Sequence, residues 1–110
     1  MRRHEVQGLA RVVSTHEGPL PGIERGHLFW VDFTDENFAR HDPSAMGAEI
    51  SVGAGGHLRR YSVSPYPQIA GWRIAVETDA PEAGQTVSVH CRLRAGSQPI
   101  SETWTYEWKS

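Results

Sequence analysis

The chain has 110 residues, of which 38% are hydrophobic and 22% charged, and its formal net charge is −2. This composition is typical of one folded domain and differs from that of a disordered chain. The basic residues form no run longer than the pairs at residues 2–3 and 59–60, so we expect no nucleic acid as a partner. No apolar run approaches the roughly 20 residues that cross a bilayer, so we also expect no membrane span.

The start of the chain carries positive charge but lacks the apolar stretch of a signal peptide. We therefore expect either a cytosolic chain or a fragment whose leader lay upstream. Residues 1–24 are interpreted as a lead-in or linker segment with at most a short strand at residues 9–14, because residues 16–22 are rich in Gly and Pro. The folded domain is predicted to span residues 25–110.

Apolar and polar residues alternate over several segments, which predicts β-strands. In residues 26–33, Phe29, Val31 and Phe33 share one face, and Trp30 lies on the other. This strand is therefore either covered on both faces or carries an exposed tryptophan. In residues 58–63, Leu58 is out of phase with Tyr61 and Val63, which predicts a bulge near residues 59–60. The other predicted strands are residues 48–52, 58–63, 71–78, 87–93 and 100–108.

The last segment is unusually aromatic and is predicted to close the core. With period 2, its inward residues are Ile100, Trp104, Tyr106 and Trp108. Strict alternation also sends Glu102 to that side, where a carboxylate needs a partner such as Arg73 or Arg94. A structural ion pair at a sheet edge is the simplest interpretation of Glu102.

The strands are separated by turn signals at intervals of roughly 8–12 residues, and no amphipathic helix of three turns is visible. The pattern predicts an all-β fold, an Ig-like antiparallel β-sandwich of about seven strands.

The sequence shows little sign of catalytic or metal chemistry. Its six histidines are scattered without the spacing that places two ligands on one face, so we expect neither a metal site nor a cofactor. Cys91 lies in an alternating apolar series and is interpreted as a buried, inert thiol. The acids that could be proposed for glycoside chemistry are Asp32, Asp35, Glu36, Asp42 and Glu102. Nothing in the sequence pairs any two of them.

Exposed aromatic residues stack on sugar rings or pack against another domain, and composition does not separate the two. The candidate carbohydrate-binding residues are Trp30, Tyr66 and Trp108.

Four motifs occur in order along the chain. They are Ala-Arg-Val-Val at residues 10–13, Phe-x-Val-Asp-Phe at 29–33, Gly-Trp-Arg at 71–73, and a C-terminal stretch at 93–108 that contains Ser-Glu-Thr-Trp. Together they resemble the C-terminal domain of the periplasmic osmoregulated-glucan biosynthesis proteins G and D. The chain departs from the family at residues 27–28 and 88–90, where charged residues are replaced. The signature residues, to which we assign structural roles, are Phe29, Asp32, Phe33, Trp72, Arg73, Ser101, Glu102, Trp104, Tyr106 and Trp108.

The resemblance implies an Ig-like module that follows a larger β-sandwich domain, which carries the glucan-binding cleft and any catalytic acids. We therefore expect a non-catalytic domain in the periplasm, with a structural or docking role in the biosynthesis of osmoregulated (β-1,2-linked) periplasmic glucans. Its expected partner is that larger domain, in cis or in trans, with glucan as a further candidate. The alternatives are a free-standing carbohydrate-binding module that uses the exposed aromatics and, less favoured, a small independent hydrolase.

Overall fold

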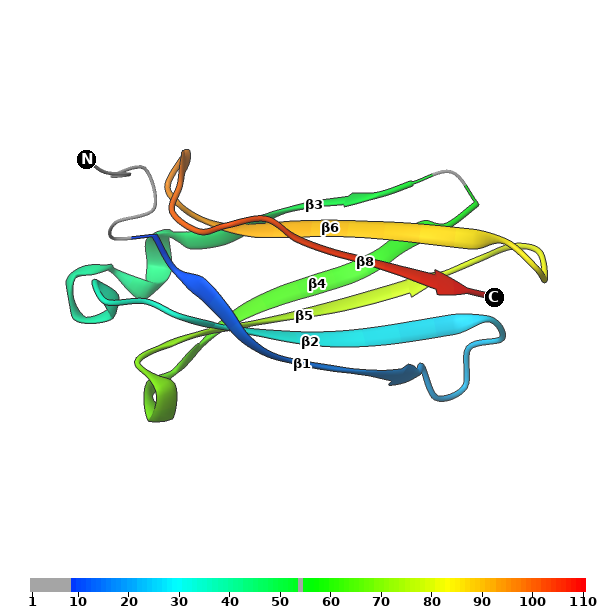
Figure 1. Ribbon diagram of the computed structural model, residues 1–110, viewed down its shortest axis with the longest axis horizontal. Coiled ribbons are helices and arrows are strands. Elements are labelled where there is room, and N and C mark those ends of the chain that lie inside the picture. Colours follow the sequence, from blue (N-terminus) through cyan, green and yellow to red (C-terminus); the bar gives the residue numbers. More distant parts are fainter. Residues whose placement is uncertain (1–8, 54) are drawn as a thin grey trace.

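Two antiparallel sheets face each other in the computed structural model, which describes residues 9–53 and 55–110 (Figure 1). Sheet one contains, in spatial order, β1 (Arg11–Pro19), β2 (Gly26–Thr34), β5 (Gly71–Asp79) and β4 (His57–Tyr66). In sheet two, β6 (Thr86–Ala95) lies between β3 (Met46–Val52) on one side and β7 (Gln98–Pro99) and β8 (Trp104–Lys109) on the other. Short 3-10 turns are formed by η2 (Phe38–Arg40), η3 (Pro43–Ala45) and η4 (Pro67–Ile69), and the described residues contain no α-helix.

The order of the strands is that of a constant-type immunoglobulin domain. The order β1-β2-β5-β4 in one sheet corresponds to strands A-B-E-D, and β3-β6-β8 in the other corresponds to C-F-G. The predicted all-β fold, an antiparallel sandwich of about seven strands, is confirmed.

The core lies between the two sheets and follows the predicted alternation. On β5, Trp72, Ile74 and Val76 are buried, and their neighbours across β2 are the buried residues of the Phe-x-Val-Asp-Phe motif. Burying a side chain of this size contributes about 1.5–3 kcal/mol to folding. The buried residues contributed by sheet two are Val87, Val89, Cys91, Leu93, Trp104 and Trp108, together with Ala48.

The first strand is longer than the sequence predicted. The sequence predicted that the first strand ends at residue 14 and that the Gly- and Pro-rich residues 16–22 break it. β1 instead continues through residues 16–19, and Pro19 pairs with His27 of β2. β1 lies at the edge of sheet one, so a proline without an N–H group disrupts no second neighbour. The interpretation of residues 16–19 as a breaker was wrong. The position of a domain boundary near residue 24 stays a prediction.

The aromatic end of the chain is interrupted, whereas the sequence predicted one strand over residues 100–108. The hydroxyl oxygen of Ser101 accepts a hydrogen bond from the backbone N–H of Leu93 at 2.8 Å. Next to it the backbone turns to Ala10, whose N–H donates to the Ile100 carbonyl and whose carbonyl accepts from the Glu102 N–H. Residues 100–102 therefore bridge to the segment that leads into β1, and β8 begins only at Trp104.

Two β-bulges lie in sheet one. The pairing of β4 with β5 shifts between Leu58 and Arg60, which confirms the predicted bulge. A second shift, between Val12 and Ser14 of β1, was not predicted. No helix within residues 9–53 and 55–110 has the length and apolarity needed to span a bilayer.

Candidate functional site

The outer face of sheet one is organised around an ion pair between Asp32 and Arg73. The two residues lie directly opposite each other on β2 and β5. The guanidinium donates from Nε to Oδ1 at 2.7 Å and from Nη2 to Oδ2 at 3.1 Å. Oδ2 also accepts a hydrogen bond from the Ser14 hydroxyl of β1 at 2.8 Å. Three adjacent strands therefore meet at one carboxylate.

The same contacts set the protonation of the pair. Burial alone would raise the pKa of Asp32, but the hydrogen bonds from Arg73 and Ser14 and the charge of Arg73 outweigh it, so the pKa lies below its ordinary value. The hydrogen bond with Asp32 in turn raises the pKa of Arg73. Both groups are charged at neutral pH, and neither is suited to act as a general acid.

Two aromatic rings lie against the guanidinium of Arg73. Its Cζ atom is 4.9 Å from the centroid of the Trp30 ring and 4.6 Å from that of Tyr66, within the range of a cation–π interaction. Trp30 is 41% exposed, which settles the alternative left open for β2 in favour of an exposed tryptophan. We call Trp30, Tyr66 and Arg73 the outer cluster.

The third candidate aromatic, Trp108, does not lie in the outer cluster. It is only 7% exposed, and its ring stacks on the His27 imidazole with centroids 4.7 Å apart and an angle of 15° between the rings. His27 in turn contacts the carboxylate of Glu17. The period-2 pattern that placed Trp108 on the inward side is confirmed, and its inclusion among the exposed aromatics was wrong.

The remaining candidate acids have structural surroundings. Asp35 is buried and accepts hydrogen bonds from the Trp72 indole at 3.1 Å and from the backbone of Asn37 at 2.9 Å, with the His41 Nε2 at 3.4 Å. Asp42 accepts from the backbone N–H of Ser44 at the start of η3.

Glu102 does not join the aromatic residues as its phase predicted. The side chain is exposed, and Oε2 accepts a hydrogen bond from the backbone N–H of Val12 at 2.8 Å. The proposed partners are engaged elsewhere, since Arg73 binds Asp32 and Arg94 donates to the Gly96 carbonyl. A hydrogen-bonded structural carboxylate is present, but its partner is a backbone amide and not an arginine.

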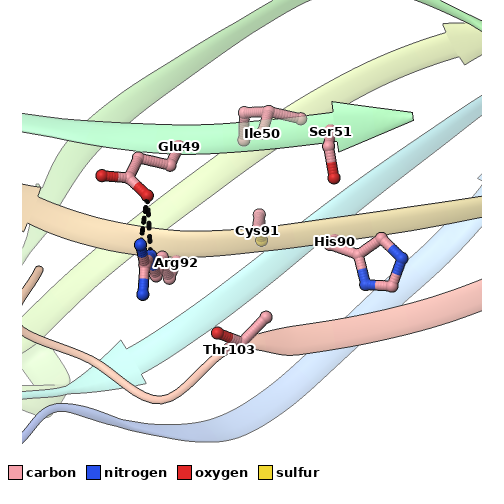
Figure 2. A pocket seen from close by; sticks show the side chains of 7 residues that line it. All are labelled: Glu49, Ile50, Ser51, His90, Cys91, Arg92 and Thr103. Carbon is pink, nitrogen blue, oxygen red and sulfur yellow. Dashed lines mark hydrogen bonds and ion pairs between the residues drawn. The ribbon is translucent and has the colours of Figure 1, made fainter. Parts of the chain in front are cut away.

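A shallow hollow on the outer face of sheet two also gathers polar side chains. Its lining includes Glu49, Ser51, His90 and Arg92, and Figure 2 shows the paired Glu49 and Arg92 at one end and His90 at the other. Arg92 Nε donates to Glu49 Oε1 at 2.7 Å, and His90 Nδ1 lies 3.1 Å from the Thr105 hydroxyl. The carboxylate and the imidazole of the hollow are thus each held by a neighbouring side chain.

Cys91 lies under this hollow and is 1% exposed. Burial raises the pKa of its thiol to about 12, so the thiolate that a nucleophile requires is not formed at neutral pH. The predicted burial of Cys91 is confirmed, and the raised pKa supports the prediction that its thiol is inert. Within the described part of the chain, no group of three or more His, Cys, Asp or Glu side chains is arranged to hold a metal ion.

Comparison with known proteins identifies the family. Residues 1–108 match the family model described as periplasmic glucan biosynthesis protein, MdoG. The chain belongs to the MdoG family. Among curated proteins it is 31% identical over 108 residues to glucans biosynthesis protein D of Xanthomonas axonopodis pv. citri and 32% identical over 106 residues to glucans biosynthesis protein D 1 of Ralstonia nicotianae. Each match covers 91% of this chain but only about a fifth of the relative, 20% and 19% respectively.

Two of the four motifs named in the sequence, Phe-x-Val-Asp-Phe and Gly-Trp-Arg, meet in sheet one. Asp32, from Phe-x-Val-Asp-Phe, binds Arg73, from Gly-Trp-Arg, and Trp72 of the same motif binds Asp35. The sequence placed Asp32 and Arg73 on two predicted strands. It did not predict that these strands are neighbours or that the two side chains pair, because strand order and register are long-range properties.

Proposed function

We propose that this chain is a non-catalytic module of an MdoG-family protein, with a structural and docking role toward a larger glucan-handling domain. The observation that carries the proposal is that the chain spans about a fifth of the length of the curated relatives it matches. The glucan-handling domain would be supplied in cis or in trans. Because the family is periplasmic, we propose the periplasm as the site of action.

The state of the acids supports a non-catalytic role. A glycoside hydrolase needs one carboxyl group that gives up a proton and a second that acts as base or nucleophile. Asp32 is held as a charged partner of Arg73, and Asp35 accepts from the Trp72 indole in the core. Glu102 is bound to a backbone amide. Recruiting any of these groups would break a contact that joins strands or turns.

The non-catalytic role is tested with linear β-1,2-glucan as substrate. We expect the purified chain, at every protein concentration tested, to release no more reducing ends than a buffer control. Release that scales with protein concentration and disappears in Asp32→Asn or Asp35→Asn variants would contradict the proposal.

A second candidate function is carbohydrate binding, which the exposure of Trp30 favours. An indole ring that projects from a rigid sheet provides a stacking surface for a pyranose ring. Titration with linear β-glucans, followed by tryptophan fluorescence, tests this candidate. A saturable change that is lost in Trp30→Ala would support sugar binding, and an unchanged spectrum would leave the docking role.

A further inference from the structure

We infer that the outer face of sheet one, centred on Trp30, Tyr66 and Arg73, is the surface through which this domain docks onto the rest of an MdoG-family protein. The inference rests on the proposed docking role and adds its location and its occupant.

Several of the residues next to the outer cluster on this face are small. Residues that lie opposite one another on neighbouring strands point to the same side of a sheet, so the register identifies this face. Ala75 is opposite Trp30, and Ser62 is opposite Ala75. The other small residues that share this face are Ser14, Gly18, Ser64 and Gly71. The rings and the guanidinium therefore have small neighbours on this part of the face, and the Arg60–Glu77 ion pair lies on the same face beyond Ser62 and Ala75.

The composition of the cluster is that of an interface hot spot. Trp, Tyr and Arg are the residue types that most often dominate binding energy when they are buried at the centre of a protein–protein contact. The Arg73 side chain is 29% exposed and already neutralised by Asp32, so covering it leaves no unpaired charge. The two hydrogen bonds and the two stacked rings also fix Arg73 before binding, which lowers the entropy cost of ordering it.

A small apolar hollow beside Trp30 adds a place for a partner side chain. It is lined by Leu28, Gly18 and Trp30, with His16 and Glu17 at the β1 side. A Cβ atom added at Gly18 would meet no atom within 4 Å, so the space above this glycine is open. An aromatic or aliphatic side chain of the partner fits such a hollow.

The position of the cluster fits a partner joined to the chain ahead of β1. Arg11, near the start of β1, is opposite Thr34, which is opposite Gly71, which is opposite Tyr66. One cross-strand row therefore links the entry of β1 to the end of the outer cluster, over about 14 Å for three strand spacings. A partner domain attached ahead of β1 would therefore join sheet one at the end where Tyr66 lies.

The occupant is argued from the length of the relatives. About four-fifths of glucans biosynthesis protein D lies outside the segment that matches this chain, and this missing part is the partner to which we commit. A glucan chain on the same face is the alternative that the experiment must exclude.

The test uses the part of Ralstonia nicotianae glucans biosynthesis protein D 1 that remains when its matching segment is removed. Binding to this chain is measured by calorimetry for wild type, Trp30→Ala, Tyr66→Ala and the control Leu58→Ala. Leu58 has nearly the same exposed fraction as Trp30, 38% against 41%. It lies opposite the buried Thr78 and therefore on the other side of sheet one. Thermal melts verify folding, and Trp30→Gln replaces Trp30→Ala if the latter unfolds.

We expect a loss of affinity of about tenfold or more for Trp30→Ala and Tyr66→Ala, and less than about twofold for Leu58→Ala. Wild-type affinity in the Trp30→Ala, Tyr66→Ala double variant would overturn the location and leave the docking role standing. If the wild-type chain itself does not bind, the docking role fails and the location with it. Saturable binding of linear β-1,2-glucan alone that Trp30→Ala abolishes would overturn the choice of occupant.

Discussion

Asp32 and Arg73 are 41 residues apart in the sequence, and on neighbouring strands they form an ion pair with two hydrogen bonds. Asp32 belongs to the Phe-x-Val-Asp-Phe motif, and Arg73 belongs to Gly-Trp-Arg. The other two residues of Gly-Trp-Arg contact the same region of β2 and the turn after it. Trp72 donates to Asp35, and Gly71 packs against the backbone of Phe33. The three residues Gly71, Trp72 and Arg73 thus join β5 to the end of β2 and the turn that follows it.

The first prediction concerns the unequal burial of the ion pair. The Asp32 side chain is 3% exposed and that of Arg73 is 29% exposed, so Arg73→Ala strands a buried carboxylate whereas Asp32→Ala leaves a cation that water can reach. We expect Arg73→Ala to lower the free energy of unfolding by about 3 kcal/mol, and Asp32→Ala by about 1–2 kcal/mol. Urea unfolding followed by tryptophan fluorescence measures both. An Asp32→Ala variant less stable than Arg73→Ala would contradict this account of the pair.

The second prediction is the acid dependence of the same pair. The pKa of Asp32 is lower in the folded protein than in the unfolded chain. In acid the unfolded chain therefore binds more protons, and the free energy of unfolding decreases as the pH is lowered. The contribution is complete above the unfolded pKa of about 3.9 and is lost as the pH falls through the lower folded value. The difference in unfolding free energy between wild type and Asp32→Asn should therefore shrink below about pH 4. A difference that stays constant down to the acid transition would show that the carboxylate is not stabilised by Arg73.

The third prediction separates two glycines of sheet one. A Cβ atom at Gly71 would lie 2.8 Å from the carbonyl carbon of Phe33 and closer still to its oxygen, and a backbone group cannot swing away. We expect Gly71→Ala to cost about 3 kcal/mol or more, whereas Gly18→Ala should change stability by less than about 0.5 kcal/mol. Equal melting temperatures for the two variants would contradict the close approach of β5 to β2.

The fourth prediction concerns the reactivity of Cys91. Burial raises the pKa of the thiol to about 12, so the folded protein should not react with a disulfide reagent near pH 8.5, where an ordinary thiol is about half ionised. The same reagent should label one thiol per chain after unfolding in guanidinium, which serves as the control. Rapid labelling of the folded protein would show that the hollow of Figure 2 reaches the sulfur.

The short-range pattern of the sequence predicted the interior well, because a half-buried strand places every second residue in the core. Trp72, Ile74 and Val76 of β5 lie where their alternation placed them, and the phase of Leu58 predicted the bulge in β4. The breaker interpretation of residues 16–19 failed because turn-forming residues are tolerated on an edge strand.

The partners of polar side chains could not be predicted, because they depend on register and on where the chain crosses between sheets. The sequence offered Arg73 as a partner of Glu102, but the pairing of β2 with β5 places Arg73 on Asp32. Glu102 lies where residues 100–102 leave β6 to bridge with Ala10, so the alternation of the aromatic segment does not apply to it.

The central claim is that this domain docks through the outer face of sheet one, and the indole N–H signals of its four tryptophans test it most directly. Trp72, Trp104 and Trp108 are buried, whereas Trp30 is exposed. In a two-dimensional NMR titration with the remaining part of glucans biosynthesis protein D 1, we predict a saturable shift of the Trp30 signal with little change in the other three. Linear β-1,2-glucan alone should leave the Trp30 signal unmoved. A Trp30 signal that ignores the protein partner, or that saturates with glucan alone, would contradict the account.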